Sequence, residues 1–170
     1  MAPPRIRPPG AADERTQLIG WLELQRALVH AKCEGLAAPE AHRRLLPTSP
    51  AMTVAGLVCH LRWVEHTWVE VLLRDRPIAG NPMFGDDPDG TFDAGGAGLA
   101  ELLDAYTRQC AVSDEVLAGA ALDDRGRHPH HGAGELTLRW MLHHVIAEVA
   151  RHVGHLDVLR EQLDGGKGYC

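Results

Sequence analysis

Apolar side chains recur at helical spacing in four long stretches of this sequence, and no stretch shows the apolar–polar alternation of a half-buried strand. The four stretches cover residues 13–34, 53–75, 98–120 and 137–163. Each has one apolar stripe that must be buried against a neighbour, and four such helices form a bundle. We therefore expect an all-α fold, a four-helix bundle.

Several of the predicted helices have recognisable ends. Thr53 is the expected N-cap of the second helix, and Gly35 and Gly165 are expected to stop the first and last helices. The connections 36–50 and 76–97 are longer than a minimal bundle needs, so the topology need not be simple up-and-down. Segment 76–97 is rich in Gly, Pro and Asp, and we expect it to cover a functional site and to influence substrate choice.

The chain is long enough for one domain of ordinary size, with 170 residues, of which 45% are hydrophobic and 24% are charged. Residues 1–12 include four prolines and little apolar content, and we interpret them as a flexible leader. The bundle is expected to span residues 13–165, and residues 166–170 are interpreted as a flexible tail.

Charge and composition exclude several classes of function. With 17 basic and 23 acidic residues the net charge is −6, which argues against binding nucleic acid. No apolar run approaches the roughly 20 residues that a membrane span needs, and the first ten residues lack the apolar core of a signal peptide. The four cysteines stand singly, which fits a reducing compartment. We therefore predict a cytoplasmic protein without a nucleic-acid or membrane partner.

Polar residues with metal-ligating side chains border the apolar stripes of two predicted helices. Glu148 and His152, four residues apart, lie on the flank of the stripe in the last helix, and His144 and His155 project along the same edge. His60 borders the stripe of the second helix in the same way. Two helices therefore direct a carboxylate and imidazoles toward the interior of the bundle.

A buried carboxylate costs several kcal/mol unless it is paired, hydrogen-bonded or bound to a metal. A divalent cation held by His60, Glu148 and His152 would compensate all three polar groups, and three protein ligands leave open positions, as in catalytic sites. Zinc, iron and nickel all suit imidazole and carboxylate ligands. Two plainer interpretations stay open at this point: His60 as a satisfied structural histidine, and Glu148–His152 as an ordinary helix pair.

Three segments resemble a known superfamily over nearly the whole chain, from Arg15 to Gly165. They are RTQLIGWLELQRALVHAKCEGL, GLVCHLRWVEHTWVEVLL and TLRWMLHHVIAEVARHVGHLDVLREQLDG, and the most specific part is the ending RHxGHxDxLRExxDG. These segments are similar to the DinB-like superfamily, and most closely to its actinobacterial branch of mycothiol-dependent proteins. The resemblance implies a four-helix bundle with a metal-binding triad.

The resemblance also implies which residues are the ligands. The first family ligand is the histidine of the segment G-L-x-x-H-L, which is His60 here, and the other two lie four residues apart on the last helix. Many members have two histidines there, whereas the mycothiol-dependent isomerase type has glutamate followed by histidine, which matches Glu148 and His152. Known activities in the wider family include thiol-dependent isomerisation and low-molecular-weight thiol S-transfer.

The leading hypothesis is therefore a metal-dependent enzyme that activates a small thiol, mycothiol or a similar one, for S-transfer to a small electrophilic substrate. Zinc is the first choice of metal, with nickel or iron as alternatives. His144 and His155 are expected to act as orienting residues or proton relays. Arg151 and Arg139 are candidates for binding anionic groups of the thiol or substrate, although a surface role is the simpler interpretation of both.

Two other hypotheses are kept. The same metal could activate water or polarise a carbonyl, which would give a hydrolase or an isomerase or lyase that needs no thiol. Alternatively the bundle could be a non-catalytic binding or stress protein. Activity without any thiol would favour the first, and indifference to loss of Glu148 and His152 would favour the second. A homodimer is compatible with each hypothesis, and the electrophile and the pathway are left open.

Overall fold

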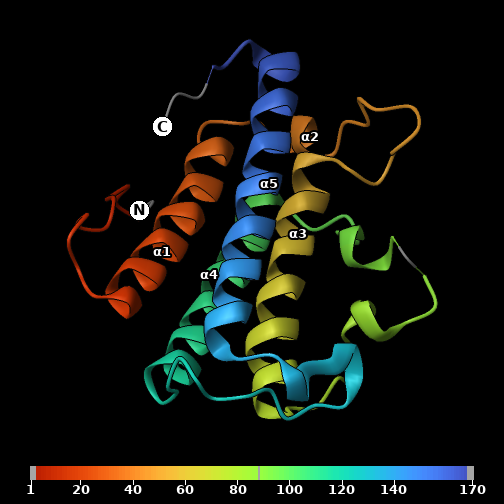
Figure 1. The fold of residues 1–170 in the computed structure, drawn as a ribbon. Coiled ribbons are helices and arrows are strands. Elements are labelled where there is room, and N and C mark those ends of the chain that lie inside the picture. Colours follow the sequence, from red (N-terminus) through yellow and green to blue (C-terminus); the bar gives the residue numbers. More distant parts are fainter. Residues whose placement is uncertain (1–2, 88, 168–170) are drawn as a thin grey trace.

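The computed structural model describes residues 3–87 and 89–167, and all the regular structure in that part of the chain is helical apart from one isolated bridge between Arg125 and Thr137. The long elements are α1 (Glu14–Cys33), α3 (Val54–Glu65) continued by the π-helix η1 (His66–Leu72), α4 (Leu99–Ala118) and α5 (Leu138–Asp164). The short elements are α2 (Ala38–Ala41), η2 (Pro82–Phe84), η3 (Gly90–Phe92) and η4 (His130–Glu135). The predicted all-α bundle is confirmed (Figure 1).

Contacts between helix ends define the direction of each rod. Arg160, near the end of α5, donates from Nη1 to the carbonyl of Lys32 near the end of α1 at 2.6 Å, so these two helices are parallel. Arg74, just after η1, donates to the carbonyl of Gly119, just after α4, at 3.0 Å, so α3 and α4 are also parallel. Arg15 at the start of α1 donates to Ala120 at the end of α4 at 2.7 Å. The bundle is therefore up–down–down–up, not simply up-and-down (Figure 1).

The hydrophobic core lies where α5 packs between α1 and α3, and where α3 packs on α4. Leu22, Leu57, Leu142 and Leu156 are fully or almost fully buried there, as the helical spacing predicts. Trp21 is an exception: its helical spacing from Leu18 and Leu28 predicts a place in the apolar stripe of the first helix, yet it keeps 40% of its surface exposed on α1. None of the helices in the described residues is both long enough and apolar enough to cross a membrane.

Side-chain caps and glycines end the helices as the sequence indicates. Thr53 Oγ1 accepts a hydrogen bond from the Gly56 amide at 3.0 Å at the start of α3, and Thr137 caps α5 in the same way through the Trp140 amide. Gly165, with φ of +74°, ends α5 in the left-handed conformation that glycine tolerates best.

The second long rod differs from the regular helix predicted over residues 53–75. After Glu65 it continues as a π-helix through Leu72, which widens the turn and shifts the side chains relative to a 3.6-residue repeat. Thr67 is consequently buried, and its hydroxyl accepts a hydrogen bond from Asn81 Nδ2 at 2.8 Å. Trp68, predicted in the apolar stripe, is only partly buried.

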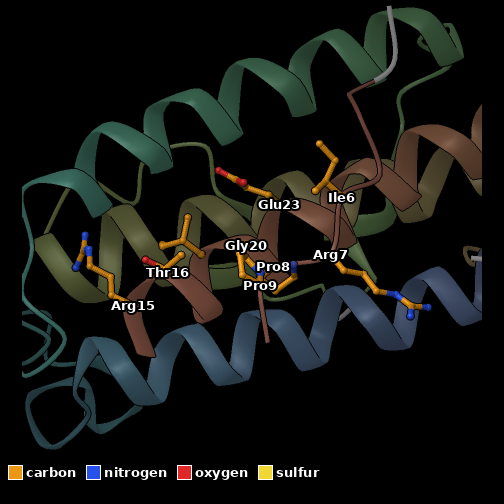
Figure 2. Close-up of a pocket in the computed structure, with 9 residues that line it drawn as sticks. Ile6, Arg7, Pro8, Pro9, Arg15, Thr16, Gly20 and Glu23 are labelled. Atoms are coloured by element: carbon orange, nitrogen blue, oxygen red, sulfur yellow. The ribbon is translucent and has the colours of Figure 1, made fainter. Parts of the chain in front are cut away.

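The described part of the N-terminal segment lies against α1. Gln17 Nε2 donates to the carbonyl of Ala12 at 2.6 Å, and Pro8 lies close to Gly20, where a Cβ atom would meet the proline ring at 2.7 Å. Ile6, Pro8 and Pro9 of this segment and Arg15, Gly20 and Glu23 of α1 line a pocket of about 460 Å³. These residues are labelled in Figure 2. Residues 1–2 and 168–170 of the predicted flexible ends lie outside the described residues.

Candidate metal centre

Two histidines and one glutamate from two helices meet at one point inside the bundle. His60 comes from α3, and Glu148 and His152 come from adjacent turns of α5. One potential ligand atom from each side chain lies within 4.8 Å of the others. His152 Nε2 is 3.5 Å from Glu148 Oε2, and the ring centroids of His60 and His152 are 4.7 Å apart. These three residues are called the triad below.

The triad is largely removed from water, which keeps its imidazoles neutral. The exposed fractions are 9% for His60 and 7% for His152, and 16% for the Glu148 side chain. Burial, with a smaller contribution from His152, lowers the pKa of His60 to about 4. Burial also lowers the pKa of His152, although the Glu148 carboxylate acts in the opposite direction. Both rings are therefore neutral near pH 7, the form that binds a metal ion.

The Nδ1 atom of each triad histidine has a partner outside the triad. His60 Nδ1 is 2.9 Å from Thr91 Oγ1, and His152 Nδ1 is 3.3 Å from His155 Nδ1. Phe92 stacks on the His60 ring with 4.2 Å between centroids and 3° between planes. Since the Nδ1 atoms are engaged, the Nε2 atoms are the ones left to coordinate an ion.

The donor set fits a divalent transition metal. It combines two neutral imidazoles with one carboxylate, and all three offer an electron pair toward the same small volume. Three protein ligands leave further coordination positions for a substrate atom, the arrangement of a catalytic rather than a closed structural site. His60, Glu148 and His152 are the only group of three or more such side chains close enough together in residues 3–87 and 89–167.

The two arginines predicted to bind anionic groups lie at different distances from the triad. Arg151 Nη1 is 3.0 Å from Glu148 Oε1, and the Arg151 side chain keeps 60% of its surface exposed. It therefore lies at the solvent edge of the triad. Arg139 lies near the start of α5, where it forms ion pairs with Glu14 and Asp123. Nine residues of α-helix separate it from Glu148, about 13 Å along the axis.

The two histidines predicted as catalytic helpers flank the triad along α5. His155 contacts His152 directly through its Nδ1 atom. His144 lies one turn before Glu148, and its ring is close to Trp68, at 4.1 Å between centroids, and stacks on Trp140 at 5.3 Å. Burial lowers the pKa of His144, while Glu148 acts to raise it. The structure thus places an imidazole on either side of the Glu148–His152 pair.

Thr91 and Phe92 contact the triad, yet residue-by-residue reasoning did not identify them. Both belong to η3 in the long connection that was predicted to cover a functional site. The available signal was the length and composition of segment 76–97, which points to the loop and not to particular side chains. Their position follows from the packing of η3 on α3.

The up–down–down–up helical bundle and the buried His–Glu–His cluster agree with the DinB-like class that the sequence resembles. Residues 17–165 match a family model described as mycothiol-S-transferase, and the chain belongs to that family. None of the curated proteins compared with the chain matches it. Family membership makes the protein a thiol S-transferase in the broad sense, an enzyme whose partner is a small-molecule thiol. The resemblance inferred from the sequence is thereby confirmed.

Proposed function

We propose that this enzyme joins mycothiol, or a closely similar small thiol, to a small electrophilic substrate at a divalent metal held by His60, Glu148 and His152. Zinc is the proposed ion, with nickel or iron as alternatives. The observation that supports the proposal is the convergence of three metal-ligating side chains within 4.8 Å in a member of a thiol S-transferase family. The metal, when bound, supplies acidity: a coordinated thiol is deprotonated at neutral pH, where a free thiol with a pKa near 8.5 is mostly protonated.

The residues around the triad are proposed to divide the remaining tasks. His60 and His152 remain neutral because they are buried, and Glu148 contributes the one negative charge of the triad. His155 orients the His152 ring by accepting a hydrogen bond from its Nδ1–H through its own Nδ1 atom. Arg151, at the solvent edge beside Glu148, is the nearer of the two predicted arginines and is proposed to meet a polar or anionic group of the thiol.

The transfer itself breaks the S–H bond of the thiol and forms a carbon–sulfur bond to the electrophile. In a substitution the leaving group departs with its bonding electron pair. In an addition to a conjugated double bond the π pair moves away from the carbon that is attacked. His144, one turn before Glu148 and neutral near pH 7, is proposed to accept the thiol proton. It then returns the proton to the leaving group or, in an addition, to the carbon that receives the π pair. The protein is proposed to work in the cytoplasm, and Cys33, Cys59 and Cys110 are free thiols, as a reducing compartment allows.

The test is to purify the protein, measure its metal content and assay it with a panel of electrophiles. Each assay is run with and without mycothiol, and thioether products are identified by mass spectrometry. We expect a thiol adduct that forms only with thiol, metal and the intact triad. Turnover of an electrophile without any thiol would replace this proposal by a metal-dependent hydrolase, isomerase or lyase. Activity that survives removal of the metal would overturn the role of the triad.

A further inference from the structure

Thr91 lies at the centre of the contact between the long connection and the triad. It is the middle residue of the turn η3, it keeps only 4% of its surface exposed, and its Oγ1 atom is 2.9 Å from His60 Nδ1. A hydroxyl group can accept a hydrogen bond from an imidazole N–H or donate one to an unprotonated ring nitrogen. In the first arrangement Nε2, the nitrogen available to a metal, carries a free electron pair. In the second arrangement Nε2 carries the proton of the neutral ring.

The turn η3 packs closely against α3 at two points. A Cβ atom on Gly56 would lie 3.0 Å from the Phe92 carbonyl oxygen and 2.3 Å from that of Ala51, so glycine is needed for this close approach. One turn further on, Cys59 Sγ donates to the carbonyl of Asp93 at 3.2 Å. The stacked Phe92 ring then covers one face of His60. The edge and one face of the imidazole are therefore fixed by the same short turn.

We infer that Thr91 is a positioning residue of the metal centre, whose hydroxyl oxygen accepts a hydrogen bond from Nδ1–H of His60 and so keeps the His60 Nε2 electron pair directed at the other two triad residues. This inference rests on the proposed function, because it assigns a task to Thr91 only if the triad holds a metal. It makes residues 90–93 part of the metal centre as well as a cover over it. A metal-ligating histidine usually donates its other N–H to such a partner, and loss of that partner weakens metal binding or activity by about 10- to 100-fold.

Three variants test the inference. Thr91→Val keeps the size and branching of the side chain but has no hydroxyl group, and Thr91→Ser keeps the hydroxyl group. Thr107→Val removes a hydroxyl group from an exposed site on α4 and serves as a control. Zinc affinity is measured by competition with a chromophoric chelator, and thermal unfolding of the metal-free proteins shows whether each variant folds. Nitrogen NMR of the imidazoles in the metal-free unmodified protein reports which nitrogen of His60 carries its proton.

We expect zinc binding to weaken by about 10- to 100-fold in Thr91→Val and to stay near the unmodified value in Thr91→Ser and Thr107→Val. The NMR measurement should place the His60 proton on Nδ1. Equal zinc affinity for the valine and serine variants, or a proton on Nε2 in the unmodified protein, would overturn the inference. The NMR readout decides even if the valine variant does not fold. Failure of the unmodified protein to bind zinc, nickel or iron would instead refute the proposed function, and with it this inference.

Discussion

Helix α3 contributes His60 and Glu65, five residues apart, to two different polar clusters. The two clusters differ in how their buried polar atoms are paired. In the first, buried Arg26 on α1 makes two hydrogen bonds to the buried Glu65 carboxylate at 2.7 and 2.8 Å and a third, at 2.6 Å, to Asp114, whose side chain is half exposed. The second is the triad, which includes His60. The residues Arg26, Glu65 and Asp114 are called the arginine cluster below.

The difference lies in what each cluster supplies. The arginine cluster contains a donor for the acceptors it buries, so its polar atoms satisfy one another. With both Nε2 atoms unprotonated, as proposed, the triad presents two imidazole electron pairs and a carboxylate oxygen to a common centre, while the other Glu148 oxygen pairs with Arg151 at 3.0 Å. A buried group of acceptors that converge without a donor among them is arranged for a cation from outside the chain. The arginine cluster is therefore expected to serve stability, and the triad to serve function.

The largest expected effect, and the most direct test of the difference between the two clusters, comes from the removal of a triad ligand. Glu148→Ala and His152→Ala should each abolish zinc uptake and thiol transfer, because each removes a proposed metal ligand. The measurements are metal content, product formation and circular dichroism. Glu161→Ala, an exposed carboxylate on the same helix, is the matched control. Full activity in either triad variant would refute the assignment.

The arginine cluster should respond in the opposite sense. Glu65→Gln leaves buried Arg26 without its bidentate carboxylate, and we expect the free energy of unfolding to fall by about 3–5 kcal/mol. Urea unfolding measures this loss, and zinc content per folded molecule should not change. Glu115→Gln, exposed on α4, should leave stability nearly unaltered. A variant that loses zinc but keeps its stability would reverse the roles of the two clusters.

A pH dependence should appear in the metal-free protein because of His60. Its pKa is about 4 in the folded chain and near 6.5 when unfolded, so the unfolded state binds more protons as the pH falls. The part of the free energy of unfolding that depends on neutral His60 is complete above pH 6.5. It is lost progressively down to about pH 4, a loss of about 3 kcal/mol. Urea unfolding at pH 7 and pH 4 should show this loss in the unmodified protein beyond that in His60→Gln. Equal losses in the two proteins would contradict it.

A smaller effect is expected from the histidine behind the triad. His155→Ala removes the partner of His152 Nδ1 and should weaken zinc binding or activity by about 10- to 100-fold without abolishing either. His143→Ala is the control, since His143 lies exposed on the same helix and directs Nδ1 at the Arg139 carbonyl. Chelator competition and steady-state kinetics measure both variants. Identical affinities in the two would show that His155 is not an orienting residue.

The sequence alone determined the helices, several of their ends and the identity of the triad. Helical periodicity and capping act over three or four residues, so Thr53 and Gly165 could be identified without knowledge of the rest of the chain. Glu148 and His152 share a helix face for the same local reason, and His60 borders the apolar stripe of the second predicted helix. The resemblance to a known family implies the same three residues. The convergence of the three residues was only a prediction from the sequence, and it is the tertiary structure that brings their side chains together.

Only the tertiary structure decided which residues surround the triad and which residues form the arginine cluster. Thr91 meets His60 across 31 residues of sequence, and Arg26 meets Asp114 across 88, and no local pattern indicates either pair. The π-helix from His66 likewise has a distant contact, because Asn81 in the long connection donates a hydrogen bond to Thr67 within it. Local propensity is encoded in neighbouring residues, whereas these contacts exist only once separate helices and loops pack against one another.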